Sequence, residues 1–313
     1  MEYFRIGNSG LKSTILTLGT ALTIGTENTN DGYADSLIDT AWRLGIRSFD
    51  TSNNYGMGEA EKLLGRALNK YNRNEYILST KGSWPIGDSP YNRGLSRKHI
   101  AEAIDSSLSK LGLDYVDIYY AHRYDPEVSM EEIVRTFNSL INQGKIRYWA
   151  TSEWPAEALQ ECHEVCGKLN LEKPILEQFI YSFAIRKSET NGVMDFCRTH
   201  RVGMLGFSPI AQGLLTGKYK NHIPSDSRIA KKDLIGYSKT ENIYMQNKDR
   251  IDTFISICDQ YKVKGSQLAL MWCIRNGVYP VVGASKPEQI EENVRALEIT
   301  YPDEIWAQLE TVL

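Results

Sequence analysis

Four side chains in the first half of the sequence could together move a proton. Asp50, Lys81 and His122 each end or directly follow a short apolar run, and Tyr55 comes five positions after Asp50. A tyrosine is a poor acid at neutral pH because its ordinary pKa is near 10, but a neighbouring ammonium group lowers that pKa. If the fold gathers these groups, Tyr55 could protonate a substrate oxygen, with Lys81 tuning its acidity and Asp50 holding the lysine.

Each of these residues also has an ordinary structural explanation. The stretch 50–54, with the sequence DTSNN, is typical of a turn, because such side chains hydrogen-bond their own backbone. A lone lysine after a strand is usually solvated, and a lone histidine is more often a structural residue. The chemical interpretation therefore depends on whether other elements bring the four groups together.

Segments typical of strands alternate with segments of helical periodicity along the chain. The expected strands are 15–22, 46–50, 76–81, 116–121, 146–150, 175–180, 204–207 and 279–282. Helices are expected at 31–44, 59–69, 96–111, 129–142, from 155, 192–200, 248–261, 266–275, 287–297 and 303–312, with Ser96 and Ser129 as caps and an irregular segment at 209–247.

About eight strand–helix units without a change in composition predict a single domain over residues 1–313. Its fold class is α/β, a (β/α)8 TIM barrel. In such a barrel the carboxyl ends of all strands face one mouth, so Asp50, Lys81 and His122 would converge there from three successive strands.

A doubly wound sheet is disfavoured because its glycine fingerprint is incomplete. Glu61 stands where the third glycine should follow Gly56 and Gly58, and the stretch 213–218 is one residue short of a P-loop. These glycines are interpreted as turn residues.

Composition limits the classes of function. A net charge of −3 and a pI near 6.0 offer no basic surface for nucleic acid or anionic lipid. No window is apolar enough to span a membrane, and no signal peptide is recognisable, so we expect a cytoplasmic protein without membrane insertion. The five cysteines lack CxxC spacing, and Cys162, His163 and Cys166 have no second ligand pair, so no metal site is expected.

The motifs FDTSNNYG, STKG and YYAHR, which contain the four residues, resemble the catalytic tetrad of the aldo-keto reductase superfamily. Within it, RGLSRKHI, MEEIVRTFNSLINQGKIRYWATSEW and SPIAQGLLTGKY are similar to the β subunits of voltage-gated potassium channels and their microbial and plant relatives. The resemblance implies a barrel with an N-terminal β-hairpin and extra C-terminal helices. It also implies NADPH-dependent reduction of aldehydes and ketones, with Tyr55 as general acid and base.

The resemblance further implies a nicotinamide cofactor extended across the barrel mouth, NADPH being favoured over NADH. The implied cofactor-binding residues are Gly19, Thr20, Asp50, Ser152, Gln178, Ser208, Ile210, Gln212, Gly213, Leu214, Lys218, Arg228, Gly283, Ser285, Lys286, Gln289, Glu292 and Asn293. Many superfamily members have an arginine at the position of Gln289, so Lys286 and Arg228 would supply the charge for a 2′-phosphate. The segment GAS before the helix from 287 independently favours a phosphate site, because helix N-termini attract anions.

The substrate is expected to be a small carbonyl compound held by Tyr55, Trp84, His122 and Trp154. The alternative function is that of a redox-sensing, channel-β-subunit-like protein with slow turnover, a membrane-channel partner and a homotetrameric assembly. The channel subunits have asparagine at the position of His122. They have arginine at the position of Glu153, and the sequence indicates no use for the glutamate there. A third function, that of a barrel hydrolase or isomerase, is disfavoured because it would need a set of metal ligands or a second carboxylate at the mouth, and the sequence offers neither.

Overall fold

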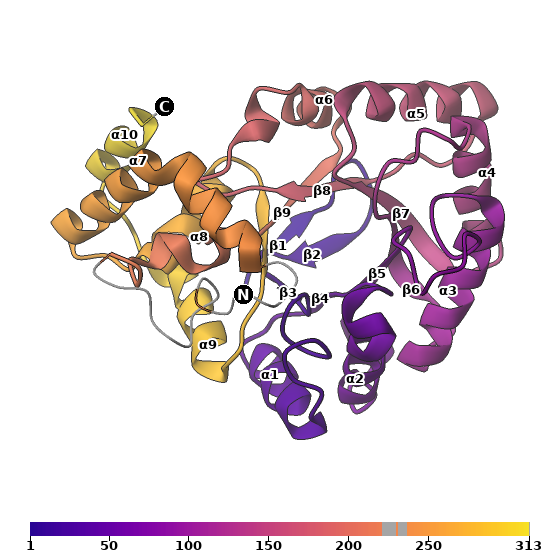
Figure 1. The fold of residues 1–313 in the computed structure, drawn as a ribbon, viewed down its shortest axis with the longest axis horizontal. Coiled ribbons are helices and arrows are strands. Elements are labelled where there is room, and N and C mark those ends of the chain that lie inside the picture. Colours follow the sequence, from indigo (N-terminus) through magenta and orange to yellow (C-terminus); the bar gives the residue numbers. More distant parts are fainter. Residues whose placement is uncertain (221–229, 231–236, 313) are drawn as a thin grey trace.

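A closed barrel of eight parallel strands lies at the centre of the computed structural model, which describes residues 1–220, 230 and 237–312. Neighbouring strands follow chain order around the ring, and the last pairs with the first (Figure 1). The strands are β3 (Thr17–Gly19), β4 (Ser48–Asp50), β5 (Ile77–Gly82), β6 (Val116–Ala121), β7 (Ile146–Ser152), β8 (Leu176–Ile180), β9 (Gly203–Phe207) and β10 (Tyr279–Val282). The predicted (β/α)8 TIM barrel is confirmed.

Helices surround the strands (Figure 1). They are α1 (Asp31–Arg43), α2 (Glu59–Leu68), α3 (Arg97–Leu111), α4 (Met130–Asn142), α5 (Ala156–Leu169), α6 (Val193–His200), α7 (Tyr237–Tyr261), α8 (Gly265–Arg275), α9 (Pro287–Arg295) and α10 (Asp303–Glu310). The predicted caps form: Ser96 Oγ accepts from His99 N–H, and Ser129 Oγ accepts from Glu132 N–H, both at 3.3 Å. These side chains satisfy amide groups that have no partner within the helix.

Some predicted boundaries are wrong. The strand expected at 15–22 is limited to β3, and the chain turns after it through Leu22, which has a left-handed φ of 62°. The segment 209–247 contains the 3₁₀ helix η4 (Ala211–Thr216) and the start of α7. The early start of α7 was not predicted: the helix is kinked at Asn247, where φ is −129° and ψ is 22°, and the sequence analysis recognised only the part after this kink. Pro155 is the N-cap of α5 and not part of its first turn.

Two apolar cores hold the barrel. The outer core packs the helices against the strands, and the inner core fills the barrel with side chains such as Ile118, Tyr120 and Leu205. A hairpin of β1 (Tyr3–Arg5) and β2 (Lys12–Thr14) contributes Phe4 and Ile6 to this inner core, and Phe4 stacks on Tyr279 at the start of β10. The predicted N-terminal hairpin therefore covers the amino ends of the strands, and the polar chemistry is left to the opposite mouth.

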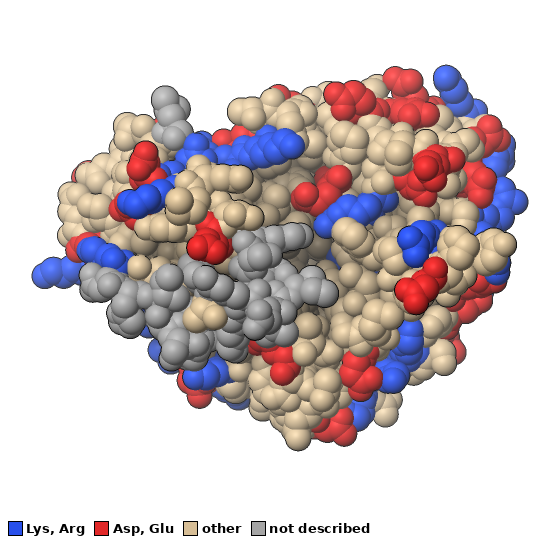
Figure 2. Space-filling model, in the orientation of Figure 1, with Lys and Arg blue, Asp and Glu red and all other residues tan. Residues whose placement is uncertain are grey.

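Acidic and basic side chains are interspersed over the face shown in Figure 2, which has a hollow near its middle. In the described part of the chain, every helix is too short or too polar to cross a bilayer.

Two helical glycines provide a matched test of the packing between α2 and α3. A Cβ on Gly65 would lie 2.2 Å from the carbonyl oxygen of Leu111, whereas one on Gly167 in α5 would meet nothing within 4 Å. We expect Gly65→Ala to lower the free energy of unfolding by about 1–3 kcal/mol through overpacking. Gly167→Ala should raise it by roughly 0.5–1 kcal/mol, because alanine favours a helix. Urea denaturation measures both, and two changes of the same sign would contradict this packing.

Candidate active site

A buried ion pair lies where β4 and β5 end. The ammonium group of Lys81, whose side chain is 0% exposed, donates to Asp50 Oδ1 and, at 2.8 Å, to the carbonyl oxygen of Thr51. Asp50 Oδ2 accepts from Ser79 Oγ at 2.7 Å and from Gln178 Nε2 at 3.3 Å. The strand order predicted this pair correctly, because parallel neighbours place their terminal side chains at one edge.

Tyr55 lies beside this pair at the start of the 3₁₀ helix η1 (Tyr55–Gly58). The Lys81 nitrogen is 5.3 Å from the centre of its ring. Burial raises the pKa of Tyr55 above its ordinary value, and the charge of Lys81 is the largest influence in the opposite direction. The predicted effect of the lysine is therefore present but smaller than that of burial. Tyr55 therefore keeps its proton at neutral pH.

The turn that presents Tyr55 requires glycine. Gly56 has a φ of 55°, and a Cβ there would lie 1.8 Å from the carbonyl oxygen of Gly25. Gly58, with a φ of 91°, precedes α2. Both act as turn residues, as the incomplete fingerprint indicated.

His122 follows β6 and faces the same space. Its Nδ1 lies 3.1 Å from Ser52 Oγ, and its ring centre is 6.2 Å from that of Tyr55. Burial, and then the positive charges of Lys81 and Arg123, lower the pKa of His122 well below its ordinary value. The imidazole is therefore neutral at physiological pH and can hydrogen-bond a carbonyl oxygen without carrying charge.

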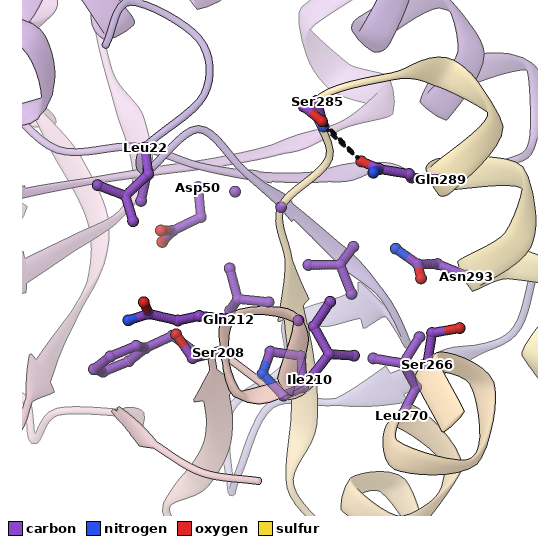
Figure 3. A pocket seen from close by; sticks show the side chains of 18 of the residues that line it. Leu22, Asp50, Ser208, Ile210, Gln212, Ser266, Leu270, Ser285, Gln289 and Asn293 are labelled. Atoms are coloured by element: carbon purple, nitrogen blue, oxygen red, sulfur yellow. Dashed lines mark hydrogen bonds between the residues drawn. The ribbon is translucent and has the colours of Figure 1, made fainter. Parts of the chain in front are cut away.

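A cavity of about 690 Å³ extends from these residues to the N-terminus of α9. Its size is that of a ligand site. Figure 3 shows side chains that point into it, with Asp50 and Gln212 toward one end and Gln289 and Asn293 toward the other. The predicted site residues that line it are Gly19, Asp50, Tyr55, His122, Ser152, Gln178, Ser208, Ile210, Gln212, Gly213, Lys218, Gly283, Ser285, Lys286, Gln289, Glu292 and Asn293.

Three predicted cofactor residues are not among those lining the cavity. Thr20 is buried and donates to Thr51 Oγ1, and Leu214 belongs to the outer core. Arg228 lies outside the described residues. The cations that line the cavity in the described chain are therefore Lys218, Lys286 and Arg123.

The far end of the cavity is organised by hydrogen bonds from α9. Gln289 Oε1 accepts from Ser285 N–H at 2.8 Å and from Ser285 Oγ at 3.3 Å, as drawn in Figure 3. Glu292 accepts from Lys264 and Ser266. Lys286 forms no ion pair within the described chain, so its charge is free to face the cavity.

One cavity wall is a strained loop that runs from the end of β9 into the first residues of η4. Ser208, Ala211 and Gln212 all have left-handed φ angles, of 57°, 46° and 56°. A left-handed backbone conformation is unfavourable for any residue other than glycine. It persists where the surrounding structure holds it in place. Gln212 Oε1 accepts from Thr240 in α7, which ties the loop to that helix.

The two predicted substrate tryptophans lie in different places. Trp84 is 41% exposed, and its ring meets that of His122 edge-on at 6.2 Å, at the rim of the site. Trp154 is 1% exposed and donates from Nε1 to the carbonyl oxygen of Ala121, so its prediction as a substrate contact is corrected. The reason is the left-handed φ of 58° at Glu153, which directs the following residue into the core.

Glu153 itself acquires a structural account. Its Oε1 accepts from Ile180 N–H at 2.5 Å, and its own N–H donates to the carbonyl oxygen of Gln178 at 3.0 Å. This residue thus fastens the end of β7 to the end of β8.

Several lining residues were missed by the sequence analysis. Arg123 could have been found, because it directly follows His122 in the motif YYAHR. No sequence pattern indicated Leu22, Phe207, Ser266 and Leu270, because barrel closure brings them to the cavity. The described residues contain no group of three side chains suited to a metal, and Cys162, His163 and Cys166 are buried in α5.

Comparison with known proteins matches residues 15–313 to the Aldo/keto reductase family. The chain is 39% identical over 300 residues to a putative voltage-gated potassium channel subunit beta of Schizosaccharomyces pombe, covering 94% of this chain and 87% of that protein. It is 37% identical over 308 residues to a probable voltage-gated potassium channel subunit beta of Arabidopsis thaliana and 36% identical over 306 residues to one of Oryza sativa subsp. japonica. Each of these two matches covers 96% of this chain and 92% of the relative.

The buried pair can be tested by removing its cation. We expect Lys81→Met to lower the free energy of unfolding by about 3–5 kcal/mol, because it leaves the Asp50 carboxylate buried without a counter-charge. The double variant Asp50→Asn/Lys81→Met should lose less than the sum of the single variants. Lys98→Met, which breaks an exposed pair with Glu102, is the control and should change stability by about 1 kcal/mol or less. Urea denaturation at pH 7 measures all of these, and equal losses for the Lys81 and Lys98 variants would contradict the assignment.

Proposed function

The chain belongs to the aldo/keto reductase family, and we propose that it is a carbonyl reductase that uses NADPH to convert aldehydes or ketones to alcohols, reversibly. The family is one of oxidoreductases that use nicotinamide cofactors, usually NADPH, and the resemblance predicted from the motifs is confirmed. The convergence of Tyr55, His122 and the Lys81–Asp50 pair at one end of a long cavity carries the proposal.

The proposed roles follow from the state of each group. A bound nicotinamide would supply the hydride at this end of the cavity. Neutral His122 orients the carbonyl oxygen, and Tyr55 gives its proton to the alkoxide that develops there. The ammonium of Lys81 stabilises the phenolate that remains, and Asp50 holds Lys81 in place. In alcohol oxidation, Tyr55 is the base.

The donor set of the cavity fits such a cofactor. Ser152 and Gln178 offer polar groups near Tyr55, and Lys218 and Lys286 offer positive charge along the remaining length. A Cβ on Gly283 would meet nothing within 4 Å, which leaves room for a ligand against the backbone. We propose NADPH in preference to NADH because the unpaired Lys286 lies next to α9, although Gln289 is a weaker phosphate ligand than an arginine would be.

A second candidate function comes from the relatives' names. We propose as the alternative a redox-sensing regulatory protein that binds the cofactor, turns it over slowly and assembles as a tetramer with a membrane channel. Within this alternative we propose a cytoplasmic location. A barrel that closes β10 onto β3 supports a single domain over residues 1–313.

Stopped-flow oxidation of NADPH by 4-nitrobenzaldehyde tests the catalytic assignment. We expect Tyr55→Phe to lower the rate by about 100- to 10,000-fold, because the proton donor is lost, while NADPH binding measured by calorimetry remains. Tyr91→Phe, on an exposed loop, is the matched control and should retain the rate.

The outcomes separate the two candidate functions. If the wild-type protein binds NADPH but does not oxidise it in the presence of the aldehyde, the reductase proposal is wrong and the regulatory one is favoured. Equal rates for wild type and Tyr55→Phe would remove Tyr55 from its role.

A second variant tests the cofactor cavity. Gly283→Leu should weaken NADPH binding by about 10- to 100-fold, because its side chain would fill the cavity without straining the backbone. Gly10→Leu, at another open glycine remote from the cavity, should leave binding unchanged. Calorimetry measures both affinities, with thermal unfolding to verify that each variant folds. Unaltered affinity in a folded Gly283→Leu protein would argue that the cofactor binds elsewhere.

A further inference from the structure

Arg123 lines the cavity next to the reacting groups and, apart from its effect on the pKa of His122, has no role in the chemistry proposed above. It follows His122 directly, and its side chain is half-buried. One amino group, Nη1, donates to the carbonyl oxygen of His122 at 2.5 Å and lies 3.3 Å from Ser152 Oγ. These two contacts fix the guanidinium at the mouth of the barrel.

The rest of this guanidinium is unsatisfied. In the described chain, Nε and Nη2 have no hydrogen-bond acceptor, and Arg123 has no carboxylate within ion-pair distance. By contrast, the partly buried Arg73 and Arg186 pair with acids at 2.6 and 2.9 Å. Because Arg123 lines the cavity, these remaining N–H groups are available to a ligand bound there.

The charge of Arg123 is also poorly compensated. Burial lowers the pKa of its guanidinium, and the charge of Glu153 is the largest influence against this. Glu153 is nevertheless engaged with Ile180 N–H and does not reach Arg123. Because an arginine stays protonated in proteins, its half-buried charge favours the arrival of an anion.

Trp84 sets the orientation of the remaining N–H groups. The central carbon of the guanidinium lies 5.3 Å from the indole centre, and the same indole lies edge-on to His122. Stacking on an aromatic face holds the planar fork in one orientation. A planar carboxylate is the anion whose two oxygens match two parallel N–H groups.

We infer that Arg123 binds a carboxylate of the substrate, so that the preferred carbonyl compounds are oxo acids or aldehyde acids. Arg123 and His122 are consecutive, so the carboxylate is separated from the reacting carbonyl by only a short span. This inference rests on the proposed carbonyl reduction and adds a substrate class to it.

A matched pair of aldehydes tests the inference. 4-Carboxybenzaldehyde and 4-nitrobenzaldehyde carry planar para groups of similar shape, but only the first is anionic at pH 7, and their difference in intrinsic reactivity cancels when the ratio is compared between variants. The readout is the ratio of their kcat/KM values with NADPH. We expect Arg123→Met to lower this carboxyl-to-nitro ratio by about 10- to 100-fold, and Arg123→Lys to lower it less, because lysine keeps the charge but loses the fork.

The control is Arg147→Met. Arg147 also stacks on an aromatic ring, that of Tyr115, but it lies near the start of β7, at the opposite end of the barrel. Its loss should leave the ratio as in the wild type. The inference would be overturned if Arg123→Met left the carboxyl-to-nitro ratio unchanged. It would also be overturned if the only effect of Arg123→Met were on the KM for NADPH.

Binding separates this inference from the proposed reaction. If the wild type reduces neither aldehyde, the reductase proposal fails, and calorimetry with benzoate on NADP⁺-loaded protein decides the carboxylate site alone. Benzoate binding that is lost in Arg123→Met supports the site. Equal binding by wild type and variant contradicts it.

Discussion

An ammonium group held away from water at the mouth of the barrel is the constraint on which the site depends. Removing Lys81 and Asp50 from solvent costs several kcal/mol for each ion, and only close, well-oriented partners offset that cost. Those partners come from three strands: Asp50 from β4, Lys81 and Ser79 from β5, and Gln178 from β8. The pair therefore requires the strands to keep the register that the closed barrel provides.

The same positive charge acts on the two neighbouring titratable groups in useful directions. It opposes the effect of burial on Tyr55, which limits the rise of that pKa, and it joins burial in lowering the pKa of His122. One lysine thus favours proton loss from the phenol while helping to keep the imidazole neutral. Arg123 adds a second positive charge with the same two effects.

The barrel and the gathering of Asp50, Lys81 and His122 could be predicted because both depend on local patterns: apolar runs of strand length and the residues that end them. What failed depends on backbone geometry that no pattern announces. The left-handed conformation of Glu153 turns Trp154 into the core. The part of α7 that precedes the kink at Asn247 was not recognised as helix from the sequence. Arg123 was visible in a motif, but its available N–H groups become apparent only when Trp84 and Ser152 are placed around it.

The N-terminal hairpin covers the end of the barrel opposite the site, and this affects how ligands reach and leave the cavity. Phe4 and Ile6 fill the end of the barrel opposite the site, so molecules reach Tyr55 and His122 from the mouth. When two ligands share a passage with one entrance, the one bound deeper must arrive before the other and depart after it. The hairpin completes a floor that the inner core already packs, so any ligands that share the cavity enter and leave through the mouth.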